Sequence, residues 1–416
     1  MHNTQQSRKH SIYSSCIISK PSQGRQEGSV STASIAWVVV SLLILSQPGT
    51  SVCALTQSQK TPTTVPCPQT NYFKPNHQPP RPTSGLMAAK DSILAQELDS
   101  EKFKATMMSR MTKEVDVNKV PSPSKVSTTT KKPQLTPVQQ TSLVTAFWRN
   151  CEQQRTDKEP LCVDPQAPIL LEKLLERDSM ESLLASPFFT GGVNLLAVRT
   201  RFIDDFILDS ALSVSGRQVG QPQPQQLVLL GSGMDTRAYR LNLHKDSVVI
   251  EVDSDMDVLR GKHDVLAMAS HKATCRVATV AVDISESEKV VSKVVTAGLK
   301  STMPTVWVLE GLLEYLKPSV HPLLLSALRR KSFPGTRIVL QCLEPSFGEY
   351  SAKLGLALPY QQLVTVEQMK RSLLEAGFCG VRVHNQDELQ HRFRRILPPG
   401  FVLMEAHVKD EETTTD

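Results

Sequence analysis

Hydrophobic residues in the second half of the chain alternate between short continuous runs and longer stretches with helical spacing. A short apolar run bounded by polar residues is typical of a buried strand, and the 3.6-residue period between the runs is typical of helices. The runs are QLVLLG, SVVIEVD, VATVAVDIS, PTVWVLEG and TRIVLQCLEP, starting at residues 226, 247, 277, 304 and 336. This alternation predicts an α/β fold with a parallel, doubly wound sheet.

Helical spacing also precedes and follows these runs. Apolar residues recur at intervals of three and four from Leu143 to Cys151, and amphipathic stretches follow at 164–177 and 193–212. We expect these helices to form a cap before the sheet. At the other end, a helix over 365–378 precedes two strands at 379–385 and 401–408 that are close enough to pair antiparallel.

The first 137 residues have a different composition, rich in Ser, Thr, Pro, Gln and Lys, and Glu27 is the only acid among the first 90. The apolar run Ser34 to Ser46 follows basic residues and precedes a small-residue stretch, so it resembles a signal peptide; an uncleaved membrane anchor is the alternative. The acid-free segment 55–90 resembles a transit peptide, which favours a plastid over secretion. We predict a leader and disordered linker over 1–137, one domain over 138–410 and a tail over 411–416.

The net charge and the cysteines restrict the classes of binding partner and the redox state of the compartment. Much of the net charge of +6 comes from the leader and linker, so it does not indicate a nucleic-acid partner. The eight cysteines include no CxxC pair, which gives no sign of a metal site and favours reduced thiols in a non-oxidising compartment.

The stretch LLGSGMDTRAYRL after the first strand predicts a ligand-binding turn. Gly231 and Gly233 stand where a parallel sheet receives its ligand, but Thr236 replaces the third glycine of a dinucleotide cradle. A pyrophosphate near Asp235 would be repelled by about 4 kcal/mol at roughly 4 Å and an effective dielectric of about 20. Asp235 would instead favour a cationic, phosphate-free nucleoside, or it caps the following helix.

Carboxylates end three of the next strands. Asp253 lies 20 residues after Gly233, where an acid binds ribose hydroxyls, and Asp283 and Glu310 end the two following strands. Helix capping is the alternative for any one of them. Arg199, in the helix before the sheet, is either a partner for a ligand carboxylate or an ordinary surface arginine.

Several ordered motifs resemble the leucine carboxyl methyltransferase family. They are VRTRFIDDFIL, LLGSGMDTRAYRL, IEVDSDMDVLRGKHDVL, VDIS, WVLEGLLEYL and RRILPPGFVLMEAH, between about Ser142 and Val408. The resemblance implies the class I methyltransferase fold, a Rossmann-like doubly wound sheet with a C-terminal antiparallel hairpin and an N-terminal helical cap. It also implies S-adenosyl-L-methionine as cofactor and methylation of carboxylates or related oxygen nucleophiles. The GMDTRAYRL motif resembles the family's bacterial branch more than its eukaryotic enzymes.

Carried over by position, the resemblance implies a role for each candidate site residue. Arg199 would hold the carboxylate of S-adenosylmethionine, and Glu310 would meet its amino group. Gly231 and Gly233 would approach the donor closely, and Asp253 would bind its ribose. Asp283 and Ile284 would contact its adenine side. PLCVDPQA, residues 160–167, follows the family only loosely, and no role is carried over there.

The sequence is compatible with several acceptors. An O-methyltransferase acting on a small molecule or a peptide is the first hypothesis. The alternatives are methylation of the C-terminal leucine of type 2A protein phosphatase, an NAD-dependent oxidoreductase and a non-catalytic binding protein. A carboxylate acceptor needs no base, whereas a hydroxyl does. Nothing in the sequence distinguishes Tyr239, Glu314, Tyr315 or His384 as that base.

Overall fold

The computed structural model describes residues 101–110, 137–212, 225–356, 358, 360 and 362–409. The apolar run 34–46, most of the predicted leader and linker, the loop 213–224 and the tail 411–416 lie outside the described residues. Within the described part, no helix is both long enough and apolar enough to span a membrane.

Helices lead into the sheet, as the spacing of apolar residues predicted. They are α3 (Pro137–Gln153), α4 (Ala167–Leu174), α5 (Arg177–Ala185) and α6 (Phe189–Leu212). Residues 101–110, which fall before the predicted domain boundary at 137, are also helical. Phe103 and Met107 from this segment are buried in one cluster with Phe147 and Phe189, so the packed structure includes part of the region assigned to the leader.

A seven-stranded sheet forms the centre of the molecule, in the order β3-β2-β1-β4-β5-β7-β6. Strands β1 (Gln226–Leu230), β2 (Val248–Asp253), β3 (Arg276–Ala281), β4 (Thr305–Leu309) and β5 (Arg337–Leu343) are parallel. Strand β7 (Phe401–His407) runs antiparallel between β5 and β6 (Cys379–His384). This arrangement confirms the class I methyltransferase fold.

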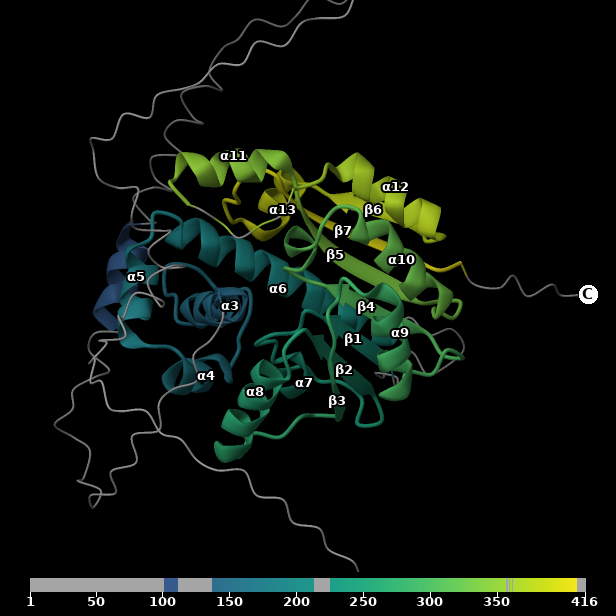
Figure 1. Cartoon of the computed structure of the whole chain (residues 1–416). Helices are drawn as coiled ribbons and strands as arrows, with labels where there is room; N and C mark the ends of the chain where they lie inside the picture. The colour runs from purple at the N-terminus through teal and green to yellow at the C-terminus, as the bar shows by residue number, and fades with distance from the viewer. Residues whose placement is uncertain are drawn as a thin grey trace, which may run out of the picture.

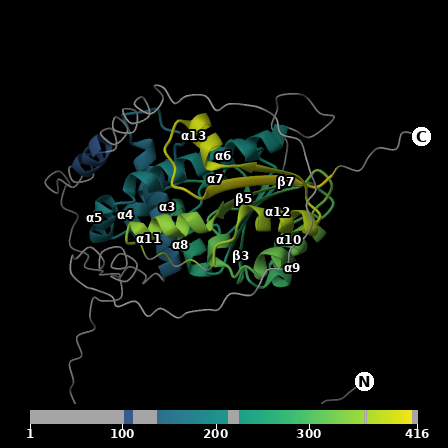
Figure 2. The ribbon, with the colours of Figure 1, turned by 90° about the horizontal axis from the view of Figure 1, so that it is seen from above.

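Helices cover both faces of the sheet because the central strands are apolar on both sides. Val228 and Leu230 of β1 face the helices α9 (Ser287–Thr296), α10 (Val320–Arg330) and α12 (Val366–Ala376). Leu227 and Leu229 face α6, α7 (Arg237–Arg240) and α13 (Gln386–Phe393). Figure 1 and the turned view in Figure 2 place these two helical layers on opposite sides of the sheet.

Two local elements differ from the expected pattern. The helix after the glycine turn, α7, has only 4 residues, because Leu241 leaves helical geometry and the chain continues through a loop to β2. The C-terminal strands pair as expected, but α13 lies between them, so they are not joined by a tight turn. The remaining helices are α8 (Met256–Met268), which packs against α4 and β2, and α11 (Pro345–Lys353), which follows β5 along the chain.

Candidate functional site

A cavity of about 570 Å³ opens at the carboxyl ends of the parallel strands. Its volume is within the range of small-molecule sites. All the candidate residues from the sequence line it: Arg199, Gly231, Gly233, Asp253, Asp283, Ile284 and Glu310. The cavity extends from the ends of β1, β2 and β3, here called the β1–β3 end, to the ends of β4 and β5 with the residues that follow them, here called the β4–β5 end.

The glycine turn shapes the β1–β3 end through its backbone. Gly231 and Gly233 have φ angles of +69° and +41°, in the left-handed region that side chains disfavour. A Cβ on Gly233 would lie 2.7 Å from the Cβ of Ser142. The Gly233 N–H donates to Asp253 Oδ2 over 2.8 Å, so the acid that ends β2 also fixes the turn. The turn therefore depends on glycine and on Asp253 together.

Asp283 and Ile284 follow β3 and differ in exposure. Ile284 is buried in the core beneath the sheet edge, whereas Asp283 is exposed. Asp283 Oδ1 accepts a hydrogen bond from the backbone N–H of Ser285 over 2.9 Å. This leaves a carboxylate and an apolar surface side by side at the cavity wall, an arrangement that suits the edge and face of a nucleoside.

Asp235 has a neighbour that the sequence did not suggest. Its Oδ1 accepts from the Arg237 N–H over 2.8 Å, and its Oδ2 accepts from Arg237 Nη1 over 2.6 Å. Asp235 therefore accepts the first backbone N–H of α7 from outside the N-cap position, which is Thr236, and Arg237 compensates the Asp235 charge. Arg237 also donates to Asp204 Oδ1 over 2.7 Å and pairs with Glu310. Its guanidinium is thus shared among three carboxylates beneath the cavity.

Arg199 and Glu310 lie together at the centre of the cavity. Arg199 is 5% exposed, so it is not a surface arginine, and its Nε donates to Glu310 Oε1 over 2.7 Å. Burial alone would raise the pKa of Glu310, but Arg237 and Arg199 outweigh it and lower that pKa to about 2. Glu310 is therefore ionised throughout the neutral range.

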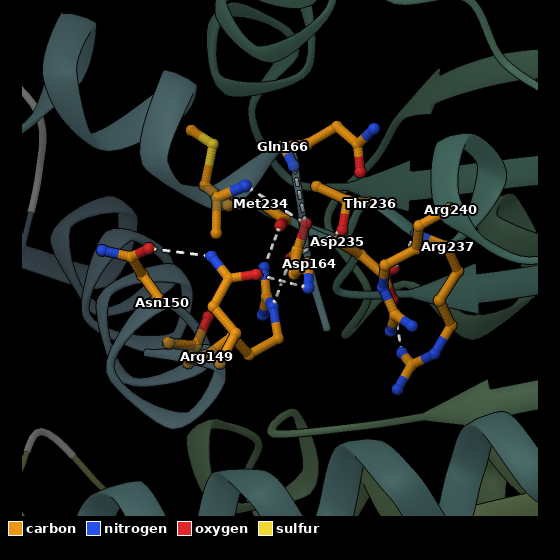
Figure 3. Close-up of polar contacts among 12 residues, drawn as sticks. Arg149, Asn150, Asp164, Gln166, Met234, Asp235, Thr236, Arg237 and Arg240 are labelled. Carbon is orange, nitrogen blue, oxygen red and sulfur yellow. Dashed lines mark hydrogen bonds and ion pairs between the residues drawn. The ribbon is translucent and has the colours of Figure 1, made fainter. Parts of the chain in front are cut away.

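A second support of the glycine turn comes from the segment 160–167, where no role was carried over. Asp164 is fully buried, and its Oδ2 accepts from Arg149 Nε over 2.7 Å and from Thr236 Oγ1 over 2.8 Å. Arg149 also donates to the backbone oxygen of Met234 over 2.6 Å (Figure 3). Burial would raise the pKa of Asp164, but the charges of Arg149 and Arg240 lower it. In the sequence, only the position of Asp164 directly before Pro165 pointed to its contacts with Arg149 and Thr236.

Glu314, four residues after Glu310, has the opposite electrostatic environment. It lines the β4–β5 end and is 6% exposed. Its Oε1 accepts from Gln341 Nε2 over 2.9 Å, whereas Oε2 has no hydrogen-bond partner among the described residues. Burial raises the pKa of Glu314 to about 7, although its own backbone N–H, Arg199 and Gln341 act to lower it. Sequence reasoning did not single it out, because burial and the Gln341 contact are tertiary.

Of the other polar residues considered as bases, one lines the cavity and two do not. Tyr315 lines the cavity, but burial raises its pKa to about 12. Tyr239 and His384 do not line it. Tyr239 contacts His263, and the His384 ring lies between Glu388 and Glu405.

Residues 142–329 match the leucine carboxyl methyltransferase family. A Mycolicibacterium vanbaalenii protein named "Putative S-adenosyl-L-methionine-dependent methyltransferase" is 37% identical over 146 residues, or 35% of this chain and 44% of that protein. Another protein of the same name and organism is 34% identical over 195 residues, or 45% of this chain and 60% of that protein. The chain thus spans about half the length of these relatives.

Among solved structures, a "putative methyltransferase from Thermobifida fusca YX" is similar with a TM-score of 0.42 and 18% identity. The alignment covers 58% of this chain and 92% of that one. The order of the seven strands defines the fold. The ordered motifs and the family match agree over the helical cap and the first four strands, which confirms the resemblance of residues 142–329 to the leucine carboxyl methyltransferase family.

Proposed function

We propose that the protein is an S-adenosyl-L-methionine-dependent O-methyltransferase acting on an oxygen nucleophile of a small molecule or a peptide. The charge of the cavity wall is the observation that carries the proposal. Two guanidiniums face six carboxyl groups there, and the buried Arg237 adds one cation behind Asp235 and Glu310, so the wall stays acidic: Arg149 and Arg199 against Asp235, Asp253, Asp255, Asp283, Glu310 and Glu314. An acidic wall stabilises a ligand with a sulfonium and an ammonium, and it disfavours a dinucleotide with its pyrophosphate.

The candidate residues of the cavity contact different parts of S-adenosylmethionine. Asp253 accepts from the ribose hydroxyls with the oxygen that Gly233 leaves free, and Asp283 and Ile284 take the adenine side. Arg199 binds the donor carboxylate and Glu310 the ammonium, and the ion pair between them holds both groups in position. These assignments follow the family resemblance and the placement of all the residues in one cavity.

Methyl transfer from the sulfonium is an in-line displacement at carbon. When bound, S-adenosylmethionine supplies the methyl group and a neutral thioether leaving group. The chain itself orients the two reactants and excludes water, which contributes most of the rate through effective molarity. The apolar residues around the β4–β5 end, such as Leu343, Phe347 and Leu356, provide that dry environment.

Calorimetry with S-adenosylhomocysteine tests donor binding. We expect a Kd in the micromolar range, about −8 kcal/mol, and at least tenfold weaker binding in Asp253→Ala. Asp253→Asn keeps an acceptor for the Gly233 N–H and should bind with intermediate affinity. The control is Asp257→Asn, an exposed acid of α8 outside the cavity wall. Binding of NAD but not of S-adenosylhomocysteine would overturn the proposal.

A further inference from the structure

We propose that the acceptor is a hydroxyl group of an uncharged, largely apolar molecule and that Glu314 is the base that removes its proton. The inference rests on the proposed function and narrows it, since a carboxylate acceptor would need no base. It is carried by the position, contacts and surroundings of Glu314 at the β4–β5 end of the cavity.

The free oxygen of Glu314 is the first observation. A buried carboxylate oxygen without a hydrogen bond is unfavourable, so natural structures rarely retain one without a use. Oε2 of Glu314 is such an atom among the described residues, while Oε1 is fixed by Gln341. Gln341 in turn accepts a hydrogen bond from Arg199 through its own side-chain oxygen. A chain of contacts therefore ties Glu314 to the Arg199–Glu310 pair at the centre of the cavity.

The difference between the pKa values of Glu310 and Glu314 is the second observation. Two arginines lower the pKa of Glu310, and burial raises that of Glu314 to about 7. Two carboxyl groups in one cavity with different proton affinities are typical of sites that separate charge stabilisation from proton transfer. The charged and titratable groups that influence or neighbour Glu314 are Arg199, Glu310, Tyr315, Cys342 and Tyr360.

The third observation is that the described cavity wall offers no cationic side chain to bind an acceptor carboxylate. Along the described cavity wall, the cationic side chains are Arg149 and Arg199. Arg149 is bound to Asp164 and to the Met234 carbonyl, and Arg199 is the proposed partner of the donor carboxylate, so neither is left for an anionic acceptor. The remaining wall near Glu314 includes aromatic and aliphatic side chains, among them Phe188, Leu343, Phe347 and Leu356. A substrate carboxylate would meet other carboxylates there, whereas a neutral hydroxyl meets an acceptor.

The proposed step is a methyl transfer coupled to loss of the hydroxyl proton. The acceptor oxygen forms a bond to the methyl carbon as the carbon–sulfur bond breaks, and the electron pair of that bond stays on sulfur. The hydroxyl proton passes to Glu314 Oε2 and is later released to water. The products are a methyl ether and S-adenosylhomocysteine, and no group is oxidised or reduced.

Binding of matched probes tests the acceptor class. The full chain is saturated with S-adenosylhomocysteine and titrated at pH 8 with 2-naphthol and with 2-naphthoic acid, which share one ring system. We expect the alcohol to bind at least tenfold more tightly than the acid, and Glu314→Gln to reduce that ratio at least threefold. Equal or tighter binding of the acid overturns the proposal, and so does failure of both probes to bind. Failure at the saturation step instead overturns the proposed function.

Transfer of labelled methyl from S-adenosylmethionine tests the base. With wild-type protein, transfer to 2-naphthol should rise with pH through about 7 and then level off, because Glu314 must be ionised to accept the proton. Glu314→Gln should lower kcat by about 100-fold or more and remove this pH dependence, with donor affinity unchanged. The control is Glu349→Gln, an exposed glutamate of α11. Transfer to the acid but not to the alcohol, or full activity in Glu314→Gln, contradicts the assignment.

Discussion

The two ends of the cavity are built in different ways. At the β1–β3 end, the ligand would meet groups that immediately follow strands, held by local contacts such as the Gly233 N–H to Asp253 bond. At the β4–β5 end, the chemistry depends on side chains brought together from separate elements, Arg199 from α6, Glu314 after β4 and Gln341 from β5. The first end follows from the fold, and the second is decided by packing.

Charge compensation differs in the same way. Asp204, Asp235 and Glu310 each have a guanidinium partner, and Arg237 alone bridges all three. Glu314 has an amide as its partner and is buried. The molecule therefore keeps one glutamate permanently charged and leaves the other able to change its protonation state near neutral pH.

Removing Arg237 should have the largest effect. Arg237→Met leaves three buried or half-buried carboxylates without their shared cation, and we expect a loss of about 3–5 kcal/mol in the free energy of unfolding. Urea denaturation at pH 7 measures it. The control Arg201→Met breaks an exposed pair with Asp205 and should cost less than about 1 kcal/mol. Equal losses in the two variants would show that the buried network adds nothing.

Replacing Glu314 should change the pH dependence of stability. Its pKa is raised to about 7 in the folded state from an ordinary value of 4.5. The free energy of unfolding of the wild type therefore falls as the pH rises between these two values. Relative to wild type, Glu314→Gln should gain roughly 2–3 kcal/mol of unfolding free energy between pH 4.5 and 8. Denaturation series at both pH values measure the gain, with Glu349→Gln as control. A difference that does not vary with pH would contradict the raised pKa.

A side chain at Gly233 should have the smallest of these effects. Gly233→Ala places a Cβ at positive φ against Ser142, and we expect about 1–2 kcal/mol of destabilisation with weaker binding of S-adenosylhomocysteine. Gly261→Ala is the control, because a Cβ there meets no atom within 4 Å and α8 favours alanine over glycine by about 0.5–1 kcal/mol. Unchanged donor binding in Gly233→Ala would show that the turn tolerates a side chain.

The sequence by itself determined the order of strands and helices and the residues at the β1–β3 end. Alternating apolar runs identify buried strands, and parallel strands place their carboxyl ends at one edge, so Gly231, Gly233, Asp253 and Asp283 were found without coordinates. A helix after the first strand was predicted, but its length of only 4 residues was not. The helix between β6 and β7 was not predicted either, because local propensity is weak over so few residues.

Only the tertiary structure decided which charges are compensated. Glu310 and Glu314 are the same residue type, and their proton affinities depend on burial and on partners up to 111 residues away, as in the Arg199–Glu310 pair. The buried contacts of Asp164 with Arg149 and Thr236 are of the same kind. A sequence gives the formal charge of each side chain, but the free energy of that charge is set by the solvent it loses and the neighbours it gains.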